Sequence, residues 1–189
     1  LQSEKDVFKE GTKFDDIIRL YTFDSNLKCL TFEALEKVEI LLRTQMTDVY
    51  SINYDSFWYT NKDLFTDKKE LIEITKCYIE NGELIERNEQ VDTLIFANLS
   101  KEIQKSVIKV EQSEFMTRFR QKYSPDSPIP SWMIMESISF GKLSRLFSLL
   151  RSSEEKRYIA KYFGAISHEY LVSWLHAFVV LRNISAHHS

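Results

Sequence analysis

Residues 167–189 constrain the fold of this chain more than any other stretch, because their apolar side chains recur at helical spacing. At about 100° per residue, one sector of a helix would collect five of them. These are Leu171, Trp174, Leu175, Phe178 and Ile184. The pattern predicts a helix that packs along one side into a hydrophobic core.

Arg182 breaks this pattern, because it follows Leu171 by eleven residues and so points in nearly the same direction. A guanidinium on a core-facing stripe loses water and needs partners. His187 and His188 follow, so a permanent cation and two groups that titrate near neutrality lie at one helix end. An ideal helix places Arg182 and His187 about 140° apart. Both serve one site only if the helix unwinds near Ala186 or a second chain supplies one of them.

The length of 189 residues and the hydrophobic fraction of 43% suit a single domain, residues 1–189, with a substantial core. Only four Gly and three Pro occur and few segments alternate strictly, so we expect an all-α protein with little or no sheet. No apolar run reaches the length of a membrane span and the start is not a signal sequence, so we expect a cytoplasmic protein without a membrane partner. Because no Met begins the sequence, we expect it to be part of a longer chain.

The net charge of −3 conceals an asymmetry along the chain. Residues 1–100 contain 12 Lys and Arg against 20 Asp and Glu, a net charge of −8. Residues 101–189 contain 13 against 8, a net charge of +5. A partner that carries phosphates fits the basic half, through release of its counterions. Alternatively, the two halves attract one another or face solvent.

Two helices are predicted in the first quarter of the chain. Residues 12–28 predict a short helix, and Thr31 is placed to cap a longer one that runs to about Tyr50. The inner face of the short helix carries Phe14, Ile17, Ile18 and Tyr21. In the longer helix, Glu39 and Arg43 form an i,i+4 pair, which at a surface contributes only a few tenths of a kcal/mol.

The middle of the chain is harder to assign. Residues 54–65 form an aromatic-rich turn with Trp58, which we expect to cover the helix ends. Residues 67–122 are charged and helical in tendency, with predicted breaks at Asn81-Gly82 and at Asn98. Cys29 and Cys77 belong to no C-x-x-C pair, which indicates two reduced thiols.

Helix boundaries are easier to predict after residue 123. Three prolines make residues 124–131 a loop, and Ser131 is placed to cap the next helix. Two helical segments meet at residues 139–141, and a helix over residues 154–163 ends at Gly164 in a left-handed conformation. Basic residues lie on the outer face of the second segment and are candidates for phosphate contacts: Lys142, Arg145 and Arg151.

Several familiar catalytic motifs are absent from the sequence. It contains no Walker loop, G-x-G-x-x-G, G-x-S-x-G or H-E-x-x-H. His176 and His187 share a helix face but lie about 16 Å apart along the axis, too far for one metal ion. We therefore expect no metal site and no cofactor.

The remaining candidate is Arg-Asn-x-x-Ala-His at residues 182–187. Metal-free RNA cleavage needs a group that takes the 2′-OH proton, a group that protonates the leaving 5′-oxygen, and a cation for the phosphorane. His and Arg suit these tasks, but nine Arg and four His produce such a spacing by chance about half the time. The structural alternative is a helix C-terminus stabilised by His, with Arg182 paired to a core carboxylate such as Glu39.

Four segments in order resemble the Abi-like proteins, the AbiD/AbiF type of bacterial phage abortive-infection proteins. They are F-K-E-G-T-K-F-D-D-I-I-R-L-Y-T-F-D-S-N-L, A-L-E-K-V-E-I-L-L-R-T-Q-M, P-S-W-M-I-M-E-S-I-S-F-G-K-L-S-R-L-F and W-L-H-A-F-V-V-L-R-N-I-S-A-H-H-S. They span nearly the whole chain. The last one resembles the R-x4-6-H motif of HEPN domains, which are all-helical and in many relatives are dimeric, metal-independent ribonucleases.

The resemblance implies a role for individual residues. Arg182 is the motif arginine, Asn183 the polar residue after it, and His187 the motif histidine, with His188 beside it. Glu39 and Arg43 match the E-x-x-x-R segment of the family, which implies an accessory position near the site.

The resemblance implies a HEPN-like helical bundle with additional helices that acts on RNA in anti-phage defence, as a homodimer and a metal-independent ribonuclease. The alternative is a non-catalytic RNA-binding module that holds a structured small non-coding RNA or a defence partner protein. A third possibility is a purely structural helical domain, in which Arg182 and His187 are locked in intramolecular pairs.

Overall fold

The computed structural model describes residues 2–4, 7–8, 11–80, 83–110, 114–124 and 127–186. Seven α-helices and two separate antiparallel hairpins form the described part of the chain. The elements are β1 Gln2–Glu4, β2 Val7–Phe8, α1 Phe14–Asn53, β3 Lys69–Glu80, β4 Glu83–Leu94, α2 Ile95–Val110, α3 Glu114–Lys122, α4 Ser131–Ser137, α5 Phe140–Leu149, α6 Glu154–Tyr162 and α7 His168–Ala186, with the short 3₁₀ helices η1 Trp58–Thr60 and η2 Lys62–Leu64.

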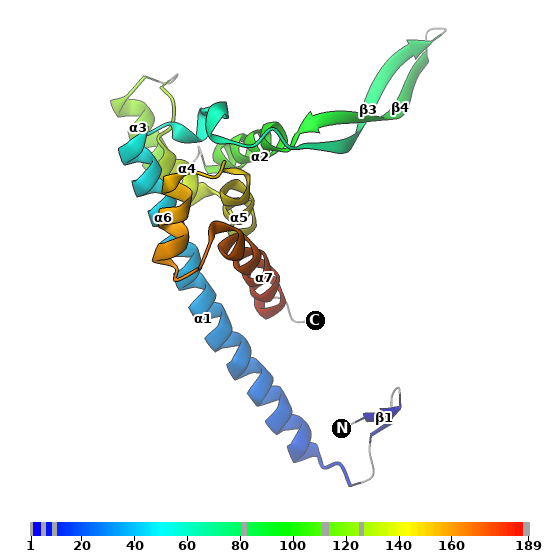
Figure 1. The fold of residues 1–189 in the computed structure, drawn as a ribbon. Helices are drawn as coiled ribbons and strands as arrows, with labels where there is room; N and C mark the ends of the chain where they lie inside the picture. The colour runs from blue at the N-terminus through cyan, green and yellow to red at the C-terminus, as the bar shows by residue number, and fades with distance from the viewer. Residues whose placement is uncertain are drawn as a thin grey trace.

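Helix α1 is 40 residues long and continuous (Figure 1). It begins after Lys13, whose backbone N–H donates to the Asp16 carboxylate at 3.0 Å. The two helices predicted here are therefore one, and the predicted cap at Thr31 is wrong. The physical reason is that no Gly or Pro interrupts residues 14–53, so nothing forces the helix to stop.

The two halves of α1 have different surroundings. From Leu35 onward, one face is buried against α4, α5, α6 and α7, whereas the first half projects away from the other helices (Figure 1). Phe14, Ile18 and Tyr21 were predicted to face inward, but all three are exposed, Tyr21 by 69%. In the single chain that prediction is wrong, and it leaves a large apolar surface uncovered.

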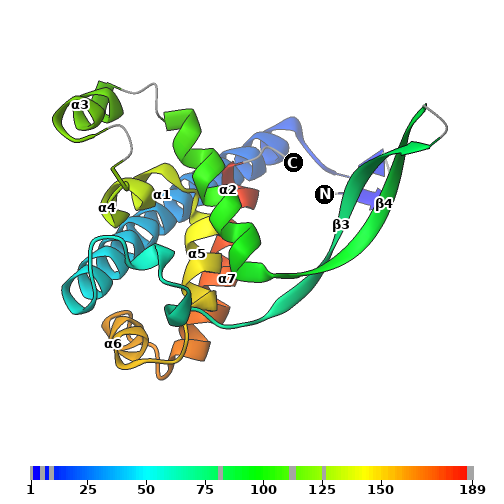
Figure 2. The ribbon, with the colours of Figure 1, turned by 90° about the horizontal axis from the view of Figure 1, so that it is seen from above.

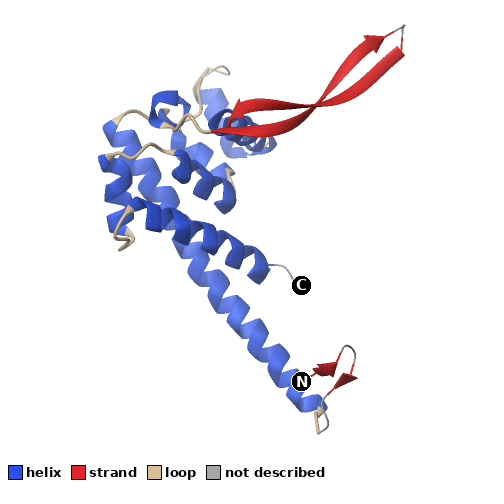
Figure 3. Cartoon of the chain, turned by 45° about the vertical axis from the view of Figure 1, so that its right-hand side comes forward, coloured by secondary structure: helices blue, strands red, loops and turns tan. Residues whose placement is uncertain are grey.

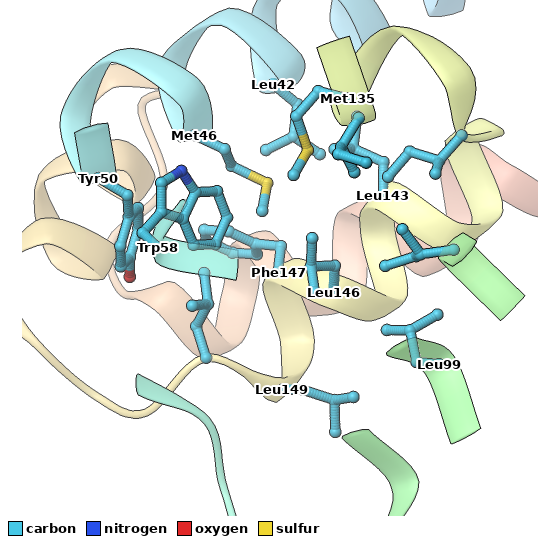
Figure 4. Packing of buried hydrophobic residues seen from close by; sticks show 14 of the residues in the cluster. Leu42, Met46, Tyr50, Trp58, Leu99, Met135, Leu143, Leu146, Phe147 and Leu149 are labelled. Atoms are coloured by element: carbon cyan, nitrogen blue, oxygen red, sulfur yellow. The ribbon is translucent and has the colours of Figure 1, made fainter. Parts of the chain in front are cut away.

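The hydrophobic core lies where the second half of α1 meets α2, α4, α5 and the aromatic turn. Trp58 and Phe147 are almost fully buried there, beside Met46 and Tyr50 of α1 (Figure 4). The ring of Phe65, also buried, stacks near that of Trp58. The turn over residues 54–65 thus covers the helix ends as predicted. Its backbone is tied to α5, because the Thr66 N–H donates to the Leu149 carbonyl at 2.8 Å.

Residues 69–80 and 83–94 pair as the two strands of a β-hairpin, so the helical tendency predicted there is wrong. Its ladder runs without a break from Lys69↔Leu94 to Glu80↔Glu83. The segment L-I-E-I-T-K-C-Y-I is rich in β-branched and aromatic residues, which favour strands. The hairpin extends away from the helices in both Figure 1 and Figure 2. The predicted break at residues 81–82 lies outside the described residues, and the one at Asn98 is wrong, because Asn98 lies within α2.

The all-α class is confirmed for the helical body, which contains the core. The strands form only two two-stranded ladders, shown in red in Figure 3. The boundary at residues 139–141 is confirmed by the separation of α4 from α5, and Gly164 ends α6 with φ = 72°. Ser131 does not cap α4: it is buried inside the first turn, and its Oγ lies 3.0 Å from Ser51 Oγ. None of the described helices is long and apolar enough to span a membrane.

Candidate functional site

Helix α7 packs against α1, α5 and α6. Leu171 and Leu175 are buried there, as the predicted stripe requires. Phe178 of the stripe is partly buried against the core, whereas Trp174 and Ile184 are exposed. The last turn of α7 therefore lies beside the middle of α1 rather than within the core.

Arg182 lies in this last turn and is half-buried. Its guanidinium carbon lies 5.5 Å from the centre of the Phe32 ring on α1. Within the part of the chain that the structure describes, the guanidinium makes no hydrogen bond and no ion pair. Arg182 therefore does not pair with Glu39, as the structural alternative proposed, and an aromatic ring takes the place of the carboxylate.

Glu39 instead pairs with Arg43. Arg43 Nη2 donates to Glu39 Oε1 at 2.8 Å, and both side chains are only 16% exposed. Arg43 Nε also donates to the carbonyl of Met135 at 2.7 Å, at the end of α4. The last carbonyls of a helix lack intrahelical donors, so Arg43 fastens α4 to α1 by satisfying them. The pair is therefore more than the surface pair that its spacing predicts.

These residues surround a hollow of about 400 Å³, here called the Arg182 hollow. It is lined by Phe32, Glu36, Glu39, Ile40, Arg43, Glu136 and Arg182. Arg43 also approaches Glu136 of α4, at 4.0 Å. Glu36 makes no hydrogen bond or ion pair to any residue that the structure describes. The hollow thus contains a bonded Glu39–Arg43 pair and, separately, an uncommitted acid and an uncommitted guanidinium.

A second hollow of about 430 Å³, the Tyr21 hollow, adjoins the first. It lies between α1, from Tyr21 to Glu36, and the end of α7 at Ser185 and Ala186. The two hollows share Phe32 and Glu36. The chain reaches the second hollow at Ala186, one residue before His187.

The structure accounts for only part of the predicted catalytic set. His187 and His188 lie outside the described residues. Arg182, Glu39 and Arg43 meet at one hollow, as the resemblance implies. Asn183 is exposed and lines neither hollow.

The predicted RNA-binding residues lie elsewhere and already have partners. Lys142 Nζ donates to Ser106 Oγ of α2 at 2.6 Å, and Arg145 lies 3.6 Å from Glu102 of the same helix. Arg151 pairs with Asp67 at 2.7 Å, just before β3. None of the three lines either hollow. Carboxylates thus partly neutralise Arg145 and Arg151, whereas Lys142 is bonded to neutral oxygen atoms.

Phe32, Glu36, Ile40 and Glu136 are the lining residues that the sequence analysis missed. A signal for two of them exists, because Phe32, Glu36, Glu39 and Arg43 follow one another at spacings of four, three and four on one face of α1. Glu136 comes from α4, and no spacing in the sequence connects it to α1. Among the described residues, no cluster of three His, Cys, Asp or Glu side chains is arranged to hold a metal ion.

Comparison with known proteins adds one positive result. The family model described as Abi-like protein matches residues 1–189. No curated protein and no solved structure matches the chain. The family match covers α1, α4 and α7, which together supply all the residues of the Arg182 hollow.

Proposed function

Because this chain belongs to the Abi-like protein family, we propose that it acts on RNA in phage abortive infection, as a metal-independent ribonuclease of HEPN type. The observation that carries the proposal is the state of Arg182. Its guanidinium is held on the Phe32 ring, yet its donors are bonded to none of the described acceptors. A cation that is positioned but not neutralised is what a phosphorane needs.

In the proposed reaction, the 2′-oxygen of a ribose attacks the adjacent phosphorus while a base removes its proton. The bond to the 5′-oxygen then breaks, and an acid protonates that leaving oxygen. His187 takes the part of acid or base, and Arg182 stabilises the charge on the phosphorane. Asn183 and His188 are proposed to assist them. The products carry a 2′,3′-cyclic phosphate and a 5′-hydroxyl, and no metal ion takes part.

Glu39 and Arg43 have an accessory part in this proposal. Both are largely buried and bonded to each other, and Arg43 also holds the end of α4. They keep α4 and α1 at a fixed distance and so maintain the walls of the Arg182 hollow. Neither group is assigned a proton transfer.

A homodimer is part of the proposal. The exposed half of α1 carries Leu20, Phe23, Leu27 and Leu30 at spacings of three, four and three, the pattern of a helix–helix seam. Each of these side chains is at least half exposed in the single chain. A second copy that covered the seam would place its own last helix close to the first one. The two copies of Arg182 and His187 then contribute to one cleft.

The test is incubation of the protein, as its full-length chain, with total cellular RNA in EDTA. The His187→Ala variant should lose cleavage by at least about a hundredfold, the scale of one proton transfer. The matched control is His176→Ala, because His176 lies exposed on the same helix but lines neither hollow. Cleavage that EDTA abolishes, or that both variants retain, contradicts the proposed chemistry. RNA that is bound in a salt-dependent manner and left intact supports the binding-module alternative instead.

A further inference from the structure

An acid and a guanidinium face the Arg182 hollow without neutralising each other. Glu36 and Arg182 both line it and both approach Phe32, Glu36 from one helical turn further along α1. Yet no ion pair joins them, and neither is bonded to another described residue. Opposite charges on a shared wall, with neither bonded to the other, match a ligand that offers acceptors to one and donors to the other.

From this arrangement we propose that the Arg182 hollow binds a guanine base of the RNA, next to the phosphate that Arg182 contacts. The inference rests on the proposed function in taking RNA as the ligand and Arg182 as its phosphate contact. Guanine presents N1–H and N2–H as adjacent donors, which match the two oxygens of one carboxylate. It also presents O6 and N7 as acceptors, which match a guanidinium. Glu36 takes the donor edge, and the N–H groups of Arg182 that do not face the phosphate donate to the acceptors.

The other three bases fit less well. Uracil has one donor between two carbonyl oxygens, and those oxygens face a carboxylate unfavourably. Adenine and cytosine each offer one exocyclic amine beside a ring nitrogen that accepts, so a carboxylate pairs with only one of the two positions. Only guanine uses both oxygens of Glu36.

The charges of the hollow also exclude the phosphate from its interior. Three carboxylates line it, from Glu36, Glu39 and Glu136, against two guanidiniums. Arg43 is already bonded to Glu39 and to the carbonyl of Met135. A phosphate therefore lies at the Arg182 edge, whereas a neutral base with donors is accepted inside.

Phe32 gives the base a surface on which to stack. Its ring faces the Arg182 guanidinium and forms a wall of both hollows. Bases that leave a stacked strand are commonly held against aromatic rings or guanidinium planes. Phe32 supplies such a ring in the wall of the hollow.

The test measures binding rather than cleavage, so that it stands apart from the proposed reaction. The full-length protein is titrated with fluorescent 2′-O-methyl oligonucleotides that differ only in one central base, guanine, inosine, adenine or uracil. The 2′-O-methyl group removes the attacking hydroxyl. We expect guanine to bind about tenfold more tightly than uracil, as a paired carboxylate contact supports. Inosine, which lacks N2–H, should fall between them.

Two variants test which residues produce the preference for guanine. Glu36→Gln should bind guanine and adenine oligonucleotides equally, while the control Glu114→Gln, which changes an exposed carboxylate on α3, should keep the preference. Phe32→Leu should weaken binding of all four oligonucleotides by about tenfold, because the stacking surface is lost. Equal affinity of the unaltered protein for all four bases overturns the guanine assignment and leaves the RNA function standing. Absence of binding to any oligonucleotide overturns both.

Discussion

At the scale of single residues, the partner of a buried or half-buried charge determines what its removal costs. Arg182 lies on the ring of Phe32, and Arg43 is bonded to a carboxylate and to a helix end. Lys156 is 4% exposed, and its Nζ donates to the carbonyl of Ser148 at the end of α5. These three cations predict three different responses to substitution.

Arg182→Ala should leave the free energy of unfolding almost unchanged. A partly exposed cation–π contact contributes about 0.5–1 kcal/mol, and no described carboxylate is stranded when the guanidinium is removed. Cleavage of RNA should fall by a factor of about 10²–10³, the usual effect of losing one group that stabilises transition-state charge. Urea denaturation and the cleavage assay on the same preparation check both parts. A loss of several kcal/mol in stability would show that the side chain has a buried acidic partner after all.

Arg43→Ala should be strongly destabilising, by about 2–4 kcal/mol. It leaves Glu39 without its partner in a largely buried position and frees the carbonyl of Met135. The matched comparison is Lys37→Ala, which breaks an exposed i,i+4 pair with Glu33 on the same helix and should leave stability almost unchanged. Chemical denaturation measures the loss of stability in each variant. Equal losses would contradict the role of Arg43 in joining α1 to α4.

Lys156 should make the protein more stable as the pH rises above 8. Burial lowers the pKa of Lys156 from 10.5 to about 8, so the unfolded chain binds more protons than the folded one between these values. The charge therefore costs stability at pH 8 and below, and this cost, at most about 3 kcal/mol, is relieved as the pH approaches 10.5. Burial raises the pKa of Tyr50 to about 12, an effect that lowers stability only above pH 10. Unfolding should be compared at pH 7.5 and about 9.5.

The lysine responsible can be identified by two substitutions on α6. Lys156→Met should remove the rise in stability, because no buried ammonium remains. Lys161→Met, which removes an exposed lysine from the same helix, should keep it. A rise that persists in Lys156→Met would assign it to another group.

At the scale of elements, the sequence predicted most reliably where Gly, Pro or a buried aromatic residue marks a boundary. The end of α6 at Gly164 and the buried turn around Trp58 are of this kind. The predicted helix cap at Thr31 was wrong because a threonine that can cap a helix is also tolerated inside one. The β3–β4 hairpin was missed because residues 69–94 mix strand-forming apolar residues with many charges, so their periodicity is ambiguous.

The candidate site was predictable only in part, for a similar reason. Spacing along α1 is enough to place Glu39 beside Arg43. It does not specify that the end of α4 lies across from Arg43, or that Phe32 faces Arg182, because both contacts join segments far apart in the sequence. The family resemblance, rather than the periodicity, brought Arg182 and the E-x-x-x-R segment together.

Replacement of residues 71–92 by a short glycine-serine turn should leave the helical body folded. The two strands pair only with each other in the described structure, and the base of the hairpin keeps its own bonds: Ile95 N–H to the Lys68 carbonyl at 2.9 Å, and Thr66 N–H to Leu149. Helical circular dichroism and the midpoint of urea unfolding should change little. Loss of the cooperative transition would show that the hairpin is part of the folded core.

At the scale of the whole molecule, the exposed seam on α1 is the feature that the single chain leaves unexplained. Monomeric proteins rarely expose an apolar surface of this extent. Leu27→Glu places a charge in the seam and should convert a dimer into a monomer, with loss of cleavage if the site is composite. Ile166→Glu is the control, because Ile166 is 91% exposed between α6 and α7 and away from the seam. Light scattering checks the mass of both variants, and an unaltered protein that is monomeric contradicts the assembly.

Tertiary packing of α1 begins only about halfway along the helix. Leu35 is the first fully packed residue of the helix, and Phe32 and Glu36 flank it. The roughly twenty residues before it are held mainly by their own hydrogen bonds, whereas most helical stability in proteins comes from tertiary packing. Winding of this segment and occupation of the hollows are therefore linked equilibria. A ligand that requires Phe32 in place raises the helicity of the segment, and anything that holds the segment wound raises the affinity of the ligand by the same factor.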